Sequence, residues 1–282
     1  MAGPGAGRDA VIRLAVRVAR AEAEVVLAEL LELVPSGLEE RDAGPDAIEY
    51  VIYGAPGEVP DVGDLRAVAG PALVDVSTSE VPDDWAERWK AWHRPVDVSW
   101  RFKRLRVRPP WEPPLDGAGL ELVIDPGQAF GTGAHHTTRL CLELLLGLEP
   151  EGALADWGCG TGVLAIGAAR LGFAPVLACD NDPNALEATR ENAAANHAEI
   201  VVERADLRRA PGPWAPTVCA NLVRTLLLDI AGHMERPPER LIASGLLREE
   251  TAEVAAAFAA HGLREAVRRT GGEWAALLLV GG

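Results

Sequence analysis

The spacing of apolar and polar positions differs between the first 80 residues and the part of the chain after Leu105. Residues 11–18 alternate between apolar and polar side chains, which predicts a strand, and residues 20–34 carry apolar side chains at helical spacing. The pattern predicts further strands at about 37–42, 47–53 and 72–78, and a short helix at 62–69. The first region therefore has the predicted order βαββαβ.

The rhythm changes after Leu105. A strand is predicted near residues 120–124 and a helix at about 136–147, after which strands and helices alternate. The later strands are predicted at 153–156, 175–179, 200–203, 216–220, 240–244 and 274–280, with helices between them. Such alternation is typical of a parallel sheet that helices cover on both faces.

These two patterns predict two domains. Residues 1–80 have the element order of a ferredoxin-like domain, a small α+β unit, and residues 99–282 predict a larger α/β domain. Residues 81–98 are predicted to be an interdomain helix and linker, with Trp85, Trp89 and Trp92 on one face of the helix. We expect these tryptophans to pack the helix onto the second domain. The alternative is that they stack on a ligand.

Composition narrows the class of protein. The chain has 282 residues, 48% of them hydrophobic, and a formal net charge of -15. An acidic chain is poorly suited to phosphate backbones, so we expect no direct binding of nucleic acid. The charge suits a basic protein partner, but a charge of this size is also common in enzymes with no such preference, and charge alone favours that second interpretation. There is no leader-like start and no apolar stretch of membrane length, so we expect a cytoplasmic protein without membrane attachment. We expect it to be a monomer.

The cysteines do not indicate a metal site or a disulfide framework. No two of them form a Cys-x-x-Cys pair, and no histidine accompanies them at ligand spacing. Buried thiols are therefore expected at Cys141, Cys159, Cys179 and Cys219.

The clearest chemical signal is a glycine-rich turn between a predicted strand and an apolar helix. It reads Asp156-Trp157-Gly158-Cys159-Gly160-Thr161-Gly162, and its glycines let a ligand approach the backbone closely. A dinucleotide fingerprint would need a glycine where this chain has Val163. S-adenosylmethionine has no phosphate, and a close backbone beside an acid suits that ligand. We therefore predict a Rossmann-like domain that binds S-adenosyl-L-methionine at Gly158 and Gly160.

Two more acids follow the next two predicted strands. Asp180 is predicted to bind the ribose hydroxyls, because ligands of such sheets lie at the carboxyl ends of the strands. Asp206 is predicted to accept a hydrogen bond from the adenine amino group, with Leu207 covering the ring. Each acid alone is also a common helix cap or turn residue. Their occurrence at successive strand ends after the glycine turn favours the cofactor site.

Two segments resemble the PrmA family, the methyltransferases of protein eleven of the large ribosomal subunit. They are Ile124 to Leu142, with its Phe130-Gly131-Thr132-Gly133 and Thr137-Thr138, and Cys219-Ala220-Asn221-Leu222. Similarity extends from about residue 82 to the end, and residues 1–80 match mainly in element order. The resemblance implies cofactor contacts at Thr138, Gly158, Asp180 and Asn221, with Phe130, Gly131 and Gly133 lining the same pocket. The chain departs from the family at His136 and at Leu222-Val223.

The resemblance implies a function as well as a fold. It implies a protein N-methyltransferase that uses S-adenosylmethionine and acts on lysine side chains, and on the α-amino group, of that basic ribosomal protein. Residues 1–80 would then form the substrate-recognition domain. One alternative is a protein-lysine methyltransferase with a different protein target. Another is a cofactor-binding ribosome assembly factor without catalysis.

Asn221 is the residue that we predict to orient the reacting amine. Methyl transfer needs a neutral nitrogen, and a lysine with a pKa of about 10.4 is only about a tenth of a per cent neutral near pH 7.4. A carboxylate would favour the ammonium form, whereas an amide oxygen orients the amine without that effect. The alternative is that Asn221 merely ends its strand in an Asx-type turn. His135 and His136 are candidate bases, although the product can lose its proton to water.

Overall fold

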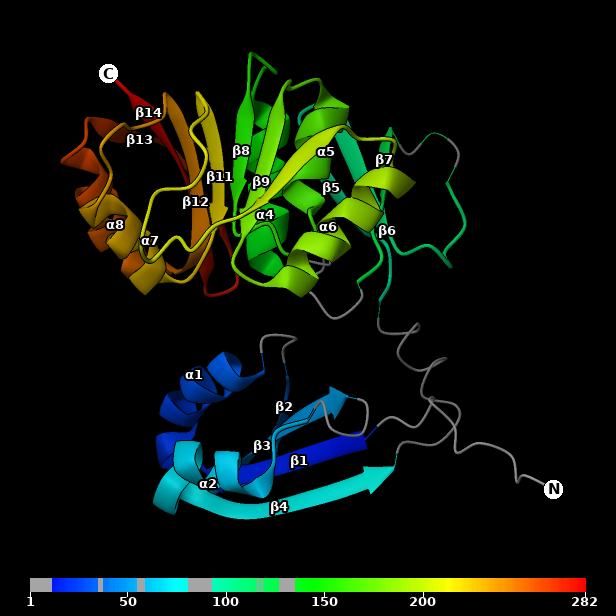
Figure 1. Ribbon diagram of the computed structural model, residues 1–282, viewed down its shortest axis with the longest axis vertical. Helices are drawn as coiled ribbons and strands as arrows, with labels where there is room; N and C mark the ends of the chain where they lie inside the picture. Colours follow the sequence, from blue (N-terminus) through cyan, green and yellow to red (C-terminus); the bar gives the residue numbers. More distant parts are fainter. Residues whose placement is uncertain are drawn as a thin grey trace. The chain divides into compact units, whose positions relative to one another are not determined.

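The computed structural model describes residues 12–34, 38–54, 59–80, 93–115, 117, 119–126 and 135–282. The chain divides into two compact units, Met1–Ala91 and Trp92–Gly282, which Figure 1 shows in blue to cyan and in green to red. The predicted interdomain helix with Trp85, Trp89 and Trp92 lies outside the described residues. Phe130, Gly131 and Gly133 lie outside them as well.

The smaller unit is a four-stranded antiparallel sheet with two α-helices. Its elements are β1 (Ile12–Ala19), α1 (Ala23–Leu33), β2 (Glu39–Asp42), β3 (Ala47–Gly54), α2 (Val62–Ala69) and β4 (Leu73–Glu80), with 3-10 turns at Arg20–Glu22 and Gly70–Ala72. The sheet has the order β2-β3-β1-β4, with every neighbouring pair antiparallel. Alternate residues of β1 are buried with both helices: Leu14, Val16 and Val18 pack with Leu30 and Leu65. The predicted element order βαββαβ is observed.

The larger unit contains a seven-stranded and a three-stranded sheet. Its elements are β5 (Val96–Trp100), β6 (Lys103–Arg108), β7 (Leu120–Val123), α4 (His136–Gly147), β8 (Leu154–Trp157), α5 (Val163–Leu171), β9 (Val176–Asp180), α6 (Pro183–Ala195), β10 (Ile200–Arg204), β11 (Thr217–Asn221), α7 (Arg224–Gly232), β12 (Arg240–Leu247), α8 (Thr251–Ala259), β13 (Leu263–Gly271) and β14 (Trp274–Gly281). The larger sheet has the order β10-β9-β8-β11-β12-β14-β13, and the smaller one β5-β6-β7.

The prediction of a purely parallel sheet is wrong at one side. Strands β8 to β12 run parallel, but β14 pairs antiparallel with both β12 and β13. Only Gly272 and Glu273 separate β13 from β14, and a connection that short joins antiparallel strands. The alternation of helices and strands therefore ends in a hairpin.

Two strands before β7 were also missed by the sequence reading. β5 begins at Val96, inside the segment predicted as linker, and pairs antiparallel with β6. In β6 the apolar residues Leu105 and Val107 are buried and alternate with arginines. Apolar and charged residues alternate in β6 as in a half-buried strand, but the many arginines hide this pattern in the sequence.

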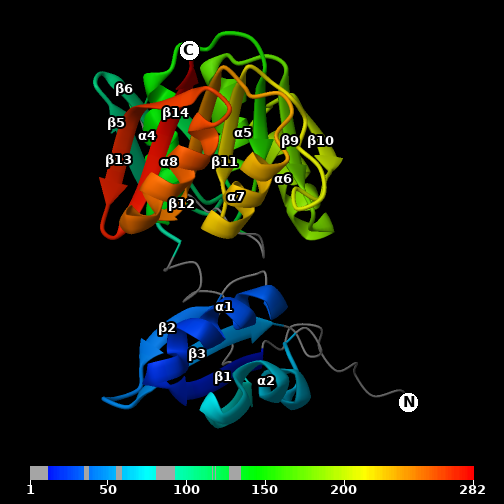
Figure 2. The same cartoon turned by 90° about the vertical axis from the view of Figure 1, so that its left-hand side faces the viewer.

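The seven-stranded sheet separates two hydrophobic cores. Leu154 of β8 and Cys219 of β11 belong to the core shared with α4, α5 and α6, and Ala155 and Val218 belong to the core shared with α7 and α8. Neighbouring residues of one strand thus serve opposite faces. Figure 2 shows α7 and α8 in front of the sheet and α4 and α5 behind it. This three-layer arrangement leaves the strand ends free for a site.

The described residues bear on the membrane, cysteine and metal predictions made from the sequence. Within them, none of the helices is long and apolar enough to cross a membrane. The four cysteines are free and buried, as expected, and burial raises the pKa of the Cys141 thiol to about 12. No cluster of metal-ligating side chains occurs in the part of the chain that the structure describes.

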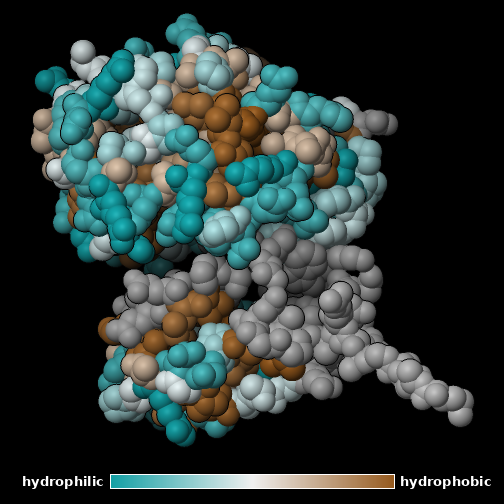
Figure 3. All heavy atoms as spheres, in the orientation of Figure 1, coloured by the Kyte–Doolittle hydropathy of each residue, from teal (hydrophilic) through white to brown (hydrophobic). Residues whose placement is uncertain are grey.

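A hollow of about 740 Å³ opens near the amino-terminal ends of β9 and β10. Apolar side chains such as Ala169, Phe173 and Ile200 line it together with the polar residues Arg170, Arg190, His197 and Glu199. Figure 3 shows hydrophobic atoms gathered on the face of the larger unit that is turned to the viewer. Gly158, Asp180 and Asn221, which are predicted to bind the cofactor, lie at the opposite, carboxyl ends of β8, β9 and β11, so this hollow is separate from them.

Candidate functional site

The glycine turn after β8 is held against the end of β9. The backbone N–H groups of Gly158 and Cys159 donate to the Cys179 carbonyl at 2.8 and 3.0 Å. Gly158 has a φ of 76°, a left-handed conformation that favours glycine. A Cβ at this position would overlap the Leu222 side chain. The turn therefore has no room for a side chain at Gly158, because Leu222 occupies that space.

Asp180 organises the same turn through its carboxylate. One oxygen accepts from the Gly160 N–H at 3.1 Å and the other from the Asp182 N–H at 3.0 Å. Each carboxylate oxygen can accept a second hydrogen bond, so both retain acceptor capacity for ligand hydroxyls. Asp180 is thus placed at the end of β9, next to the predicted cofactor loop.

Asp156 lies beneath the turn and is only 1% exposed. Its Oδ2 accepts from the Ala165 N–H at 3.0 Å, which connects β8 to the first turn of α5. Within the described residues its Oδ1 has no hydrogen-bond partner. Burial raises the pKa of this carboxyl to about 7, the Ala165 hydrogen bond opposes that shift, and the Asp180 charge adds to it.

Asn221 and Thr138 meet although 83 residues separate them in sequence. The Asn221 Nδ2 donates to the Thr138 Oγ1 at 3.3 Å. Thr138 lies in the first turn of α4 and is fully buried, and Asn221 ends β11. The Asn221 Oδ1 is buried and has no hydrogen-bond partner among the residues that the structure describes. A buried amide oxygen of this kind is costly, and a hydrogen-bond donor from a ligand would satisfy it.

Asp206 has local partners of its own. Its carboxylate accepts from the Arg208 N–H at 3.2 Å and forms an ion pair with Arg209 at 3.1 Å. Leu207 is buried in the core that includes α7 and α8. These contacts are those of a turn-capping residue, so the predicted contact of Asp206 with adenine stays a prediction.

His135 caps the amino terminus of α4. Its Nδ1 accepts from the Thr137 N–H at 3.3 Å and lies 2.8 Å from the Thr137 Oγ1. The ring packs edge-on against Trp274, with 4.9 Å between the centroids. Burial and the neighbouring His136 lower the pKa of His135, which favours the neutral imidazole that such acceptance requires.

One face of α6 supports the site and was missed by the sequence reading. The Thr189 hydroxyl donates to the Gly160 carbonyl at 2.9 Å, and the Asn192 Nδ2 donates to the Thr161 carbonyl at 3.0 Å. The Asn192 Oδ1 accepts from the Asp125 N–H at 2.8 Å. The available signal was the spacing of Thr189, Asn192 and Asn196, which places three polar side chains on one face of a helix.

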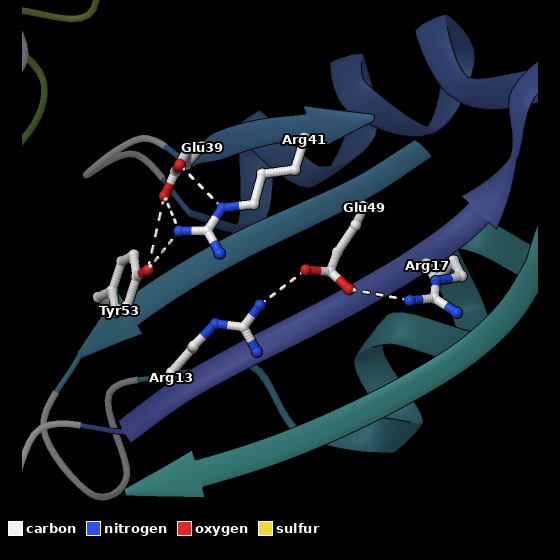
Figure 4. A network of polar contacts seen from close by, with 6 residues as sticks. All are labelled: Arg13, Arg17, Glu39, Arg41, Glu49 and Tyr53. Carbon is white, nitrogen blue, oxygen red and sulfur yellow. Dashed lines mark hydrogen bonds and ion pairs between the residues drawn. The ribbon is translucent and has the colours of Figure 1, made fainter. Parts of the chain in front are cut away.

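A second candidate surface is the face of the smaller sheet that lies opposite α1 and α2. Figure 4 shows Glu49 of β3 between two arginines of β1, with Arg13 at 2.7 Å and Arg17 at 3.4 Å. On the adjacent edge, Arg41 pairs with Glu39 at 2.8 Å. This charged face suits contact with a protein partner rather than the binding of a small apolar ligand.

Comparisons with known proteins agree with the arrangement in the larger unit. The family model of the ribosomal protein L11 methyltransferase (PrmA) matches residues 67–280. The ribosomal protein L11 methyltransferase of Burkholderia ambifaria is 33% identical over 277 residues, covering 88% of this chain and 91% of that protein. The enzyme of the same name from Herpetosiphon aurantiacus is 38% identical over 220 residues, covering 69% of this chain and 68% of that protein.

Among solved structures, the ribosomal protein L11 methylase of Lactobacillus delbrueckii subsp. bulgaricus is similar with a TM-score of 0.58 and 26% sequence identity. The match covers 67% of this chain and 97% of that one.

Proposed function

The chain belongs to the ribosomal protein L11 methyltransferase (PrmA) family, and we propose that it transfers methyl groups from S-adenosylmethionine to ribosomal protein L11. The acceptors in this proposal are lysine side chains, with the α-amino group as a second class. A net charge of -15 suits a basic protein substrate. The reaction would take place in the cytoplasm, where ribosomal proteins are made, and would need no nucleic acid, membrane or second copy of the chain.

The two domains divide the work in this proposal. Residues 1–80 form the substrate-recognition domain in this proposal, and the strand order β2-β3-β1-β4 supports a ferredoxin-like fold for it. The interdomain segment predicted at residues 81–98 overlaps β5, so we take the larger unit, Trp92–Gly282, as the catalytic domain of the Rossmann-like class. The charged face of the smaller sheet, with Arg13, Glu49 and Arg17, is the surface that we assign to L11. Because arginines outnumber glutamate among these three residues, the attraction of a basic substrate is a property of the whole chain rather than of this group.

The residues of the larger domain fit S-adenosylmethionine. The turn at Gly158 excludes a side chain, the Asp180 carboxylate retains acceptor capacity, and the Asn221 Oδ1 is buried without a partner in the described structure. When bound, the cofactor supplies a methyl group activated by a positive sulfur. We assign it to Thr138, Gly158, Gly160, Asp180, Asp206 and Asn221, together with Phe130, Gly131 and Gly133.

Asn221 has the properties needed to orient a neutral amine. Keeping a lysine neutral near pH 7.4 costs about 4 kcal/mol, and an adjacent free carboxylate would increase that cost. The Asp180 carboxylate is engaged by two backbone N–H groups, and Asp156 is buried beneath the turn. The Asn221 Oδ1 can accept one N–H of the amine, which directs the nitrogen lone pair toward the methyl carbon. The methylated nitrogen then loses its proton to water.

The observation that carries this proposal is the buried, unsatisfied Asn221 oxygen beside Thr138, in a chain of this family. The test is transfer of labelled methyl groups from S-adenosylmethionine to purified L11, followed by mass spectrometry of its peptides. We expect label on lysines and on the amino terminus of L11. A second basic ribosomal protein in the same reaction serves as the specificity control.

The other outcomes separate the alternative functions. Label on a different protein in extract, with none on L11, would retain the methyltransferase and reject the ribosomal target. Cofactor binding without transfer to any basic protein would favour a non-catalytic assembly factor.

A further inference from the structure

A β-bulge in β12 flanks the Asn221-Leu222 segment. Between Ala243 and Leu246, β12 advances by three residues while its antiparallel partner β14 moves back by two, from Leu277 to Ala275. Ser244 and Gly245 therefore share one partner position, which defines the bulge. On the other side of β12, the parallel register pairs Ser244 with Asn221. The irregular point of β12 thus lies directly beside the proposed amine-orienting residue.

Gly245 allows the backbone of Leu222 to approach closely. It has a φ of 84°, and a Cβ there would overlap the Leu222 carbonyl. The Leu222 N–H donates to the Ser244 carbonyl at 3.0 Å. The Leu222 side chain in turn fills the space that a Cβ at Gly158 would need. Leu222 is therefore fixed between two glycines, with its backbone against Gly245 and its side chain against the cofactor turn.

Ser244 connects the bulge to the other partner of Asn221. Its buried hydroxyl lies 3.1 Å from the Ala275 carbonyl and 3.4 Å from the Thr137 carbonyl. Thr137 directly precedes Thr138, which accepts the hydrogen bond from Asn221. The bulge consequently contacts the chain at both ends of the Thr138–Asn221 hydrogen bond.

From this geometry we propose that the Ser244-Gly245 bulge is a positioning element for methyl transfer. It sets the distance between the Asn221 amide and the glycine turn, and thereby the direction in which the amine meets the methyl group. Ser244 and Gly245 act through Asn221, Leu222 and Thr138 and are positioning residues rather than catalytic ones. The proposal rests on the proposed function, because Asn221 has a role to be positioned for only if methyl transfer occurs.

A matched pair of glycine variants tests it in the full chain. Gly245 and Gly262 have nearly the same φ, 84° and 82°, so Gly245→Ala and Gly262→Ala impose similar backbone strain. They differ in surroundings, since a Cβ at Gly262 meets no described atom within 4 Å. The difference between the two variants therefore reports the contact with Leu222.

Three quantities are measured for each variant. The first is the pair of side-chain amide resonances of Asn221, assigned by their loss in Asn221→Ala. The others are the single-turnover rate of methyl transfer at saturating cofactor and the cofactor dissociation constant. We expect Gly245→Ala to shift the amide resonances and to slow transfer at least tenfold, with the cofactor constant changed less than threefold. Gly262→Ala should keep the resonances and stay within twofold in rate.

Other results would overturn the proposal. Unmoved Asn221 resonances in Gly245→Ala, or a rate equal to that of Gly262→Ala, would show that the bulge does not position the amide. A rate loss matched by an equal loss of cofactor affinity would assign the bulge to cofactor binding. If the unmodified chain transfers no methyl group, the proposed function fails, while the resonances still decide whether the bulge positions Asn221.

Ser244→Ala decides the case if Gly245→Ala does not fold. It removes the hydroxyl contacts with the Thr137 and Ala275 carbonyls and leaves the backbone unchanged. We expect a shift of the Asn221 resonances and a three- to tenfold slower transfer. An unchanged spectrum and rate in this variant would also refute the proposal.

Discussion

The two domains use polar side chains in opposite ways. In the smaller domain, Arg13, Arg17 and Glu49 pair on a sheet face where Arg17 remains 44% exposed. In the larger domain, Asp156 and the Asn221 oxygen are buried, and both have atoms without a partner in the described structure. Exposed ion pairs contribute little to folding, whereas unsatisfied buried groups oppose it. Under the proposed function, the first set serves recognition, and the buried Asn221 oxygen is retained at a cost in stability because it orients the amine.

Substitutions in the two domains test this comparison. The largest effect is expected in the larger domain, at Gly158 of the cofactor turn. In Gly158→Ala the new Cβ would overlap Leu222 in a backbone conformation that already disfavours alanine. We expect cofactor affinity to fall about a thousandfold, or ~4 kcal/mol, as measured by calorimetry. Gly172→Ala is the control, because Gly172 also has a positive φ but its Cβ would lie at an ordinary 3.5 Å from Pro150. Equal affinities of the two variants would contradict a close approach of the cofactor to Gly158.

The next effect concerns the pH dependence of stability. The folded pKa of Asp156 is raised to about 7, so the folded chain binds this proton more tightly than the unfolded chain, whose aspartate has a pKa of about 3.9. The contribution of Asp156 to stability is thus greatest at low pH and declines as the pH rises from about 4 to about 7. Relative to the parent chain, Asp156→Asn should gain on the order of 3 kcal/mol in unfolding free energy between pH 5 and pH 8.

Urea unfolding of both proteins across this pH range measures the effect. The difference between them removes the contributions of the other titrating groups. Parallel curves for the two proteins would show that Asp156 has an ordinary pKa in the folded state.

A third effect separates chemistry from binding at Asn221. Asn221→Ala removes the amide that we propose to orient the amine, so the methyl-transfer rate should fall about a hundredfold. The cofactor constant should change less than threefold, because the glycine turn and Asp180 remain. A time course of methyl transfer measures the rate, and calorimetry on the same preparation measures the cofactor dissociation constant. A rate close to that of the parent chain would leave Asn221 with only a structural role at the end of β11.

The smallest effect on stability is expected on the charged sheet of the smaller domain. Arg17→Ala should change the unfolding free energy by less than about 0.5 kcal/mol, because the pair with Glu49 is long, at 3.4 Å, and the Arg17 side chain is 44% exposed. If this face recognises L11, the KM for L11 should rise severalfold while kcat is unchanged. Arg268→Ala, which breaks an exposed pair with Glu265 in the larger domain, should alter neither constant. The same KM for both variants would remove this face from substrate recognition.

Local pattern predicted those elements whose signal lies in a few neighbouring residues. The glycine turn between β8 and α5 was predicted because Gly158, Gly160 and Gly162 follow an apolar strand directly. The six main elements of the smaller domain were found from period two and helical spacing alone. β13 was missed because polar residues, among them Arg264, Arg268 and Arg269, outnumber its apolar ones and leave no regular alternation. Its antiparallel direction depends on the short Gly272-Glu273 connection.

Contacts between distant parts of the chain could not be read in this way. The Thr138–Asn221 hydrogen bond joins residues of α4 and β11 whose separation is set by the whole sheet. The resemblance to a family implied that both contact the cofactor, but not that they contact each other. The bulge at Ser244-Gly245 depends on the register with β14 and has no signature in the residues of β12 alone.

The place of β14 in the sheet bears on how the chain is made. It follows the other described strands in sequence, yet it lies between β12 and β13 rather than at an edge. While a ribosome is still synthesising this segment, β12 has an unpaired edge, and the Ser244 hydroxyl lacks the Ala275 carbonyl. An incomplete chain therefore exposes a sheet edge prone to aggregation and has no finished site. The proposed site is therefore completed only after β14 has left the ribosomal tunnel and paired with β12.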